Sequence, residues 1–191
     1  TVDNIQLIAS SIMSKKIASG ADYILLDVKV GSGAFMKSLE NAIELSKTMV
    51  QIGEAFNKKI RAVITNMHQP LGKSVGNSLE VIEAIETLKN NGPQDFIDLC
   101  LFLAANILEM TGTANNIEDG IHKAKNSILS GSALECFENL IKLQHGNNKV
   151  IGDYSLFGNS SYTVSINSIK SGYVYSIDAE LIGKAALLSG A

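Results

Sequence analysis

Two short apolar segments stand out in the first third of the chain. Residues 23 to 28 are apolar except for Asp27, and residues 60 to 65 form a second segment after the polar turn Lys58-Lys59. Such runs are typical of parallel strands covered by helices on both faces. Apolar residues recur at helical intervals from about 38 to 57 between them. Strand, helix and strand in this order predict a right-handed βαβ unit with parallel strands.

Outside these two segments and the helix between them, apolar residues recur mostly at helical spacing. The first predicted helix covers residues 4 to 18, where Asp3 and Gln6 have capping-box spacing and Gly20 occupies the position of a C′ glycine. Asn77 and Glu80 have the same capping spacing before a later helix. The further predicted helices cover residues 78–89, 96–110, 117–129, 132–143 and 179–188. The helix over 96–110 is apolar nearly all round, which predicts a buried spine.

The pattern changes after about residue 150. Residues 161–166 and 172–176 alternate between apolar and polar positions, which predicts two short strands. We therefore expect a boundary near residue 155. The fold class that follows is α/β, with a parallel sheet flanked by helices, and the chain contains no internal repeat.

Composition narrows the possible functions. The chain has 191 residues, 46% hydrophobic and 18% charged, which suffices for one sizeable core. A net charge of -3 without a run of five like charges argues against nucleic acid as a partner. No apolar run approaches the roughly 20 residues of a membrane span, and no leader pattern precedes the first helix. We expect a cytoplasmic protein without a membrane partner.

The cysteines and two of the histidines are interpreted as structural. Cys100 and Cys136 lie among apolar residues of predicted helices, so we expect reduced core residues and neither a disulfide nor a metal pair. His122 and His145 have no partners at metal or triad spacing. Candidate chemistry must therefore come from other residues.

Two loops follow the predicted strands. Gly31-Ser32-Gly33 follows the first strand, and residues 66 to 77 follow the second. Loops after parallel strands share the sheet edge where α/β proteins bind ligands, so we expect them to face each other. The Gly-Ser-Gly sequence lacks the third glycine of a dinucleotide fingerprint, and Lys37 lacks a P-loop glycine pattern. An ordinary strand-to-helix turn remains an alternative to a ligand site.

Three polar side chains are candidates for binding. Ser11 and Lys15 lie one helical turn apart, where a hydroxyl and an ammonium group could together bind a carbonyl-rich ligand. The alternative is a solvated polar face shared with neighbouring serines and Lys16. Glu83 falls near the loop end of its helix. It could be a ligand, and the alternative is an exposed helix glutamate.

Four ordered motifs resemble one enzyme family. They are Thr1-Val2-Asp3, Ala9-Ser10-Ser11-Ile12-Met13-Ser14-Lys15-Lys16, the segment from Asp27 to Lys37, and Gln69-Pro70-Leu71-Gly72 through Val75-Gly76-Asn77. In this order they resemble pyrimidine-nucleoside phosphorylase and thymidine phosphorylase. The match extends through the whole chain, including Lys170-Ser171-Gly172-Tyr173-Val174 and Ile182-Gly183-Lys184-Ala185-Ala186.

The resemblance implies an activity and an architecture. Members of this family split thymidine, uridine or deoxyuridine with phosphate, giving the free pyrimidine base and (2-deoxy)ribose 1-phosphate. They act as homodimers in which a small helical domain closes onto a larger α/β domain. By resemblance, residues 1–19 are a helix of the small domain, 20–155 part of the α/β domain, and 156–191 the start of an α+β C-terminal domain.

The resemblance also assigns site residues. Ser11 and Lys15 match the serine and lysine that bind the pyrimidine, and Lys16 matches the lysine beside them. The apolar lining of the base pocket is matched by Val2, Ile8 and Phe35. A bacterial subgroup holds a potassium ion (K⁺), whose ligands are matched by the carbonyls of Leu71 and Ser74 and the carboxylate of Glu83; Ser74 stands where alanine is usual.

The resemblance places the phosphate loop, the catalytic histidine, and a base-binding tyrosine and arginine before Thr1. No catalytic residue is therefore assigned within the 191 residues, and we expect them to be inactive alone. Two alternatives stay open. One is a non-catalytic truncated fragment. The other is an anthranilate phosphoribosyltransferase-like enzyme, which lacks the Ser-Ile-Met-Ser-Lys-Lys and Gln-Pro-Leu-Gly patterns.

Overall fold

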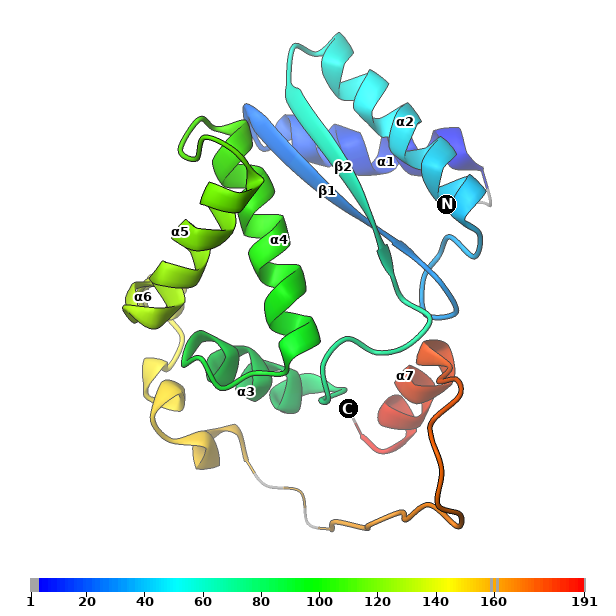
Figure 1. The fold of residues 1–191 in the computed structure, drawn as a ribbon, viewed down its shortest axis with the longest axis vertical. Helices are drawn as coiled ribbons and strands as arrows, with labels where there is room; N and C mark the ends of the chain where they lie inside the picture. Colours follow the sequence, from blue (N-terminus) through cyan, green and yellow to red (C-terminus); the bar gives the residue numbers. More distant parts are fainter. Residues whose placement is uncertain (1–3, 159, 161, 191) are drawn as a thin grey trace.

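A two-stranded parallel sheet organises the chain. The computed structural model describes residues 4–158, 160 and 162–190. Strands β1 (Tyr23–Val30) and β2 (Lys59–Asn66) pair in parallel, with Tyr23 opposite Lys59. Helix α2 (Leu39–Ala55) connects them (Figure 1). The predicted βαβ unit and the α/β class are confirmed.

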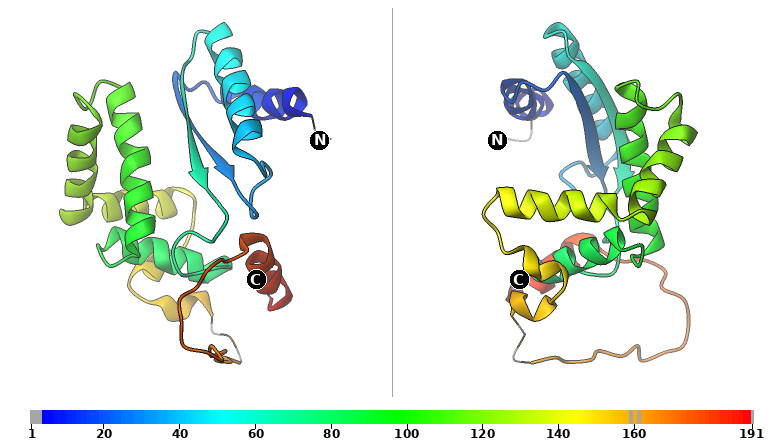
Figure 2. Two further views of the ribbon diagram at one scale, coloured as in Figure 1. Left: turned by 45° about the vertical axis from the view of Figure 1, so that its right-hand side comes forward. Right: turned by 90° about the vertical axis from the view of Figure 1, so that its left-hand side faces the viewer.

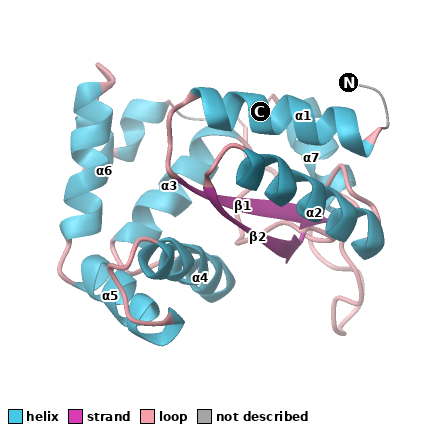
Figure 3. Cartoon of the chain, turned by 90° about the horizontal axis from the view of Figure 1, so that it is seen from above, coloured by secondary structure: helices cyan, strands magenta, loops and turns pink. Residues whose placement is uncertain are grey.

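Helices cover both faces of this sheet. Helix α1 (Ile5–Ala18) and α2 lie on one side, and α4 (Gln94–Met110) lies on the other (Figure 3). Helix α5 (Ile117–Leu129) packs against α4. The other elements are α3 (Asn77–Leu88), α6 (Ser132–Leu143), α7 (Ala179–Leu188) and the 3₁₀ helices η1 (Asn148–Ile151) and η2 (Tyr154–Phe157). Within the described residues no helix is both long and apolar enough to span a membrane.

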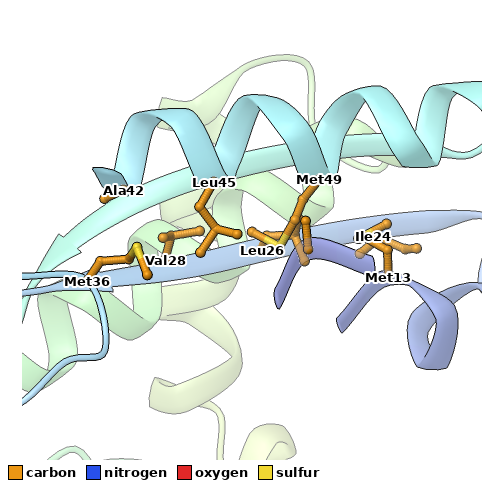
Figure 4. Packing of buried hydrophobic residues seen from close by; sticks show 9 residues of the cluster. Met13, Ile24, Leu26, Val28, Met36, Ala42, Leu45 and Met49 are labelled. Atoms are coloured by element: carbon orange, nitrogen blue, oxygen red, sulfur yellow. The ribbon is translucent and has the colours of Figure 1, made fainter. Parts of the chain in front are cut away.

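The core lies between β1 and the first two helices. Alternate residues of β1, namely Ile24, Leu26 and Val28, are each only 6% exposed. They pack against Met13 of α1 and Met49 of α2 (Figure 4). Burying a side chain of this kind stabilises the folded state by about 1.5 to 3 kcal/mol. This face of β1 therefore holds α1 and α2 in place.

The other face of the sheet carries charged pairs. Lys29 lies 2.6 Å from Asp27, whose carboxylate also accepts a hydrogen bond of 2.5 Å from Thr65. Arg61 donates to Asn106 of α4 at 2.9 Å and pairs with Glu109 at 2.6 Å. Because these charges are paired within the sheet and α4, we interpret Asp27 as a structural residue.

Helix α4 is less buried than its composition predicts. Its buried residues are Leu101, Ala105 and Asn106, whereas Phe102 is 40% and Ile107 48% exposed. The prediction of a spine buried all round is wrong, because α4 is covered on one side by the sheet and α5 and not on the opposite side.

In the structure, two helix caps lie one residue away from the positions that the sequence predicted. Asn4 caps α1 by accepting a hydrogen bond of 3.0 Å from Leu7 N–H, whereas Asp3 lies outside the described residues. At α3 the cap is Gly76, whose N–H donates to the Glu80 carboxylate at 2.7 Å. The expected pairing of Asn77 with Glu80 is therefore wrong, since Asn77 is already the first helical residue.

The strands expected at 161–166 and 172–176 are wrong for the residues that the structure describes. Residues 162–166 and 172–176 form no strand, and Ile166 is 94% exposed. An alternating pattern makes a stable strand only where a neighbour pairs with its backbone and covers its apolar face. Between η2 and α7 the described part of the chain offers no such neighbour (Figure 2).

Neither cysteine is fully buried. Cys100 is half-buried, and this desolvation raises the pKa of its thiol. Cys136 lies exposed on α6, so its assignment to the core is wrong. Both are free thiols in the structure.

The loops after β1 and β2 contact each other through their backbones. Met67 N–H donates to the Val30 carbonyl at 2.7 Å, and Gly33 N–H donates to the Met67 carbonyl at 3.0 Å. At Gly31, φ is +144°, and a Cβ atom there would meet the backbone of Met67 and His68. The expectation that the loops face each other is confirmed, and the contact depends on Gly31 being a glycine.

A polar cluster ties η2 to the end of α3. The Tyr154 hydroxyl donates to Glu86, and Lys89 donates to the same hydroxyl at 2.7 Å while lying 4.7 Å from the ring centroid. Asn91 donates to the second Glu86 oxygen at 2.9 Å. These hydrogen bonds, that from Tyr154 first, lower the pKa of Glu86 from 4.5 to about 2.

We predict that Gly31→Ala destabilises the chain by about 3 kcal/mol or more, because a left-handed backbone and a backbone clash act together. The matched control is Gly112→Ala, since Gly112 has φ +73° and a Cβ atom there would have nothing within 4 Å. It should cost about 1 to 2 kcal/mol from φ alone. Urea unfolding measures both, and equal losses would contradict the role of the loop contact.

We predict that Glu86→Gln makes stability less sensitive to acid. A lowered folded-state pKa contributes stability above pH 4.5, and this contribution is lost as the pH falls from 4.5 towards about 2. Between pH 6 and pH 3 the parent chain should lose about 1 to 2 kcal/mol more than the variant, after allowance for solvent screening. Urea unfolding at both pH values tests this, with the exposed Glu44→Gln as control. Identical losses in the parent and Glu86→Gln would refute it.

Candidate functional site

The glycine loop after β1 folds back on itself. Gly31 N–H donates to the Met36 carbonyl at 3.0 Å, and Ala34 N–H donates to the Gly31 carbonyl at 3.1 Å. Ala34 and Met36 point into the protein, each less than 8% exposed, whereas Phe35 between them is 61% exposed. The tight loop therefore presents one aromatic side chain outward from the carboxyl end of the sheet.

Phe35 forms the wall of a cavity beside α1. The cavity has a volume of about 530 Å³, and its lining includes Ile8, Ile12 and Lys16 of α1, Phe35, and the β1 segment 25–29. A second cavity of about 760 Å³ shares Ile8 and Phe35 and extends to Lys37 and Glu180. Three of the residues predicted to bind the base, Ile8, Lys16 and Phe35, are thus brought together.

The other predicted base-binding residues lie elsewhere. Ser11 is half-buried and Lys15 exposed on α1, and neither lines these two cavities. Within the described residues neither side chain makes a hydrogen bond, and Ser14 beside them is exposed as well. Val2 lies outside the described residues.

The loop after β2 wraps around the carboxylate of Glu83. Lys73 N–H donates to both Glu83 oxygens, at 3.0 and 3.2 Å. Gly72 has φ +72°, and a Cβ atom there would meet Glu83 Oε2, so the close approach needs glycine. Glu83 is therefore held against the loop and is not the free helix glutamate that the sequence allowed.

The predicted K⁺ ligands lie around one cavity. Leu71, Ser74 and Glu83 all line a space of about 640 Å³. Carboxylate and carbonyl oxygens are donors that hard cations prefer, so the residues present fit such an ion. Among the described residues no cluster of three His, Cys, Asp or Glu side chains could hold a metal. A cation here would depend on the backbone carbonyls as well as Glu83.

Helix α7 lies against the glycine loop (Figure 1). Lys37 Nζ donates to the Ser32 carbonyl at 2.6 Å and pairs with Glu180 at 3.2 Å. Glu180 also accepts from Lys184 at 2.7 Å, and these lysines, Lys184 first, lower the pKa of the Glu180 carboxyl. The sequence analysis missed Ser32 and Glu180, since no periodicity or spacing links residues so far apart in the chain.

Comparison with known proteins identifies the family. The model described as "Glycosyl transferase family, a/b domain" matches residues 1–134. Pyrimidine-nucleoside phosphorylases of Geobacillus stearothermophilus, Bacillus subtilis (strain 168) and Staphylococcus aureus (strain USA300) are each 46% identical to the chain over all 191 residues. The chain spans 44% of the length of each of these relatives.

The resemblance inferred from the four motifs is therefore confirmed. The matched region contains α1, the βαβ unit and both loops at the carboxyl end of the sheet. By its sequence and its α/β architecture, the chain belongs to the glycosyl transferase family characterised by this a/b domain.

Proposed function

We propose that the chain forms the base-binding part of a pyrimidine-nucleoside phosphorylase. The complete enzyme would react thymidine, uridine or deoxyuridine with phosphate to give the pyrimidine base and (2-deoxy)ribose 1-phosphate. The observation that carries this proposal is 46% identity, along every residue of the chain, to relatives of that name. The cavity between α1 and Phe35 supports it, since an apolar wall with few polar groups suits a small planar ligand.

We further propose the setting in which this part works. The complete protein would be a cytoplasmic homodimer of pyrimidine salvage, with residues 1–19 in a small helical domain, 20–155 in the α/β domain and 156–191 in a C-terminal domain. Phosphate would bind to parts of the complete protein outside these 191 residues. The expected inactivity of the 191 residues alone follows from this division and stays a prediction.

Each site residue has a role in this proposal. Val2, Ile8 and Phe35 would cover the faces of the pyrimidine, and Lys16 would lie at the edge of the same cavity. Ser11 and Lys15 would hydrogen-bond the carbonyl oxygen and ring nitrogen of the base. Neither group lines the cavity in the present structure. The long Lys15 side chain would reach it from α1, and closure of the helical domain would bring the short Ser11 hydroxyl towards it.

The chemistry assigns charge stabilisation to these two groups. Phosphate oxygen forms a bond to the sugar carbon while the glycosidic bond breaks, and the bonding electrons leave with the base. The Lys15 ammonium and the Ser11 hydroxyl would stabilise the negative charge that develops on the base. Donors aimed at a developing charge lower the barrier because they bind the transition state more strongly than the substrate.

We predict that Lys15→Ala in the complete protein lowers kcat/KM for thymidine or uridine by about 100- to 1,000-fold, as for the loss of one oxyanion-type donor. The control is Lys47→Ala, which removes an exposed lysine of α2 that lines none of these cavities. Steady-state phosphorolysis assays measure both. An unchanged kcat/KM in Lys15→Ala would remove Lys15 from the mechanism.

We also propose that Leu71, Ser74 and Glu83 hold a K⁺ ion. The ion would supply a positive charge that ties the loop after β2 to neighbouring parts of the complete protein. Glu83 is suited to this because Lys73 N–H and the tight turn at Gly72 already fix its carboxylate. The carbonyls of Leu71 and Ser74 would complete the oxygen donors from this chain.

We predict that the chain melts at a higher temperature in KCl than in tetramethylammonium chloride of equal ionic strength. Glu83→Gln should abolish this difference, because an amide oxygen carries no charge to offset dehydration of the ion. Glu44→Gln, which changes an exposed glutamate of α2, should preserve it. The same difference between salts in Glu83→Gln as in the parent would exclude Glu83 as a ligand.

A further inference from the structure

Three segments far apart in the sequence meet at Ser32. The Ser32 hydroxyl donates to the His68 carbonyl at 2.9 Å, which links the loops after β1 and β2. Ala179 N–H, at the start of α7, donates to the Ser32 hydroxyl at 3.1 Å and to the His68 carbonyl at 3.0 Å. One serine side chain therefore bonds to both other segments.

The three segments are also closely packed. A Cβ atom at Gly33 would lie 2.7 Å from the Ala179 Cβ and 3.3 Å from the Met67 carbonyl. Contacts of that length leave no room for a side chain at Gly33. The start of α7 is therefore seated directly on the glycine loop.

Lys37, which follows Phe35 in the sequence, provides a second link between the glycine loop and α7. Lys37 Nζ pairs with Glu180 of α7 at 3.2 Å and donates to the Ser32 carbonyl at 2.6 Å. Ser32 and Lys37 therefore bracket the segment 33–36, and both contact α7. Phe35, the 61% exposed wall of the cavity, lies inside this bracket.

We propose that Ser32 is a positioning residue that couples α7 to the base cavity. It fixes the loop that carries Phe35 to the start of α7, so that α7 sets the position of the aromatic wall. This inference rests on the proposed function where it names the pyrimidine as the occupant. The coupling itself rests on the hydrogen bonds at Ser32 and Lys37.

The coupling has a consequence for substrate binding. A loop held at both ends before the ligand arrives loses less conformational entropy on binding. Release of the loop therefore weakens binding of the base more than it slows the chemical step. Ser32 does not contact the reacting atoms and acts through Phe35.

Two variants break the junction from opposite sides. Ser32→Ala removes the hydroxyl, whereas Ala179→Pro leaves Ser32 intact, removes the N–H that donates to both Ser32 and His68, and puts a ring carbon against these two acceptors. Proline is favoured at the first helical position, and Asp178 before it already has the extended backbone (φ -99°, ψ 107°) that proline requires. Ser32→Thr keeps a hydroxyl, and Ser171→Ala changes an exposed serine without a side-chain hydrogen bond among the described residues.

Hydrogen exchange of the 191-residue chain, followed by mass spectrometry, tests the coupling. Amides of residues 33–37 should exchange about tenfold faster in Ser32→Ala and in Ala179→Pro, as expected when a restraining hydrogen bond is lost. Ser32→Thr and Ser171→Ala should match the parent, and α4 should exchange equally in all variants. Parent-like exchange of residues 33–37 in both Ser32→Ala and Ala179→Pro would overturn the proposal.

Kinetics in the complete protein separate positioning from a purely structural role. Ser32→Ala should raise KM for the nucleoside about fivefold or more and leave kcat within about twofold, because binding and not chemistry depends on the loop. A lower kcat with unchanged KM would overturn the assignment. If the parent shows no phosphorolysis, the proposed function fails, and hydrogen exchange still decides whether Ser32 couples α7 to the loop.

Discussion

The backbone contact between the two loops at the carboxyl end of the sheet is the constraint on which the rest of the site depends. It needs Gly31, because any side chain there would collide with the backbone of Met67 and His68. Once the loops touch, the first can present Phe35 beside α1, and the second can close around Glu83. The apolar cavity beside Phe35 and the loop around Glu83 thus both depend on the same backbone contact.

The sequence predicted those parts of the fold that local periodicity determines. The βαβ unit, the positions of the helices and the facing loops all follow from apolar spacing and the topology of parallel strands. The prediction of strands within residues 162–176 was wrong, because an alternating pattern specifies a strand only when a neighbouring strand is present. Likewise, the exposure of Cys136 depends on which elements cover α6, and periodicity carries no information about that.

For the candidate site, the resemblance matched Val2, Ile8 and Phe35 to the lining of a base pocket and Lys16 to a lysine beside Lys15. In the structure Ile8, Lys16 and Phe35 line one cavity, whereas Ser11 and Lys15 do not line it. The junction of Ser32 with Ala179 was not predictable, since 147 positions separate the two residues and only the folded chain brings them together. Neither residue type carries a chemical signal by itself: a serine in a glycine loop and an alanine at the start of a helix are ordinary.

The position of Ser11 requires a movement of α1 if its proposed role is correct. Ile8, Ile12 and Lys16 form the row that faces the cavity, and at about 100° per residue Lys15 lies about 60° and Ser11 about 100° away from the centre of that row. The long stem of Lys15 can bridge such an angle, whereas the short Ser11 hydroxyl cannot. The fully buried residues of α1 are Ala9 and Met13, and its residues Ile5, Ile8, Ile12 and Ile17 pack against the same core, so a rotation of the helix would have to rearrange these contacts. Ser11 and not Lys15 is therefore the residue whose role demands closure of the helical domain.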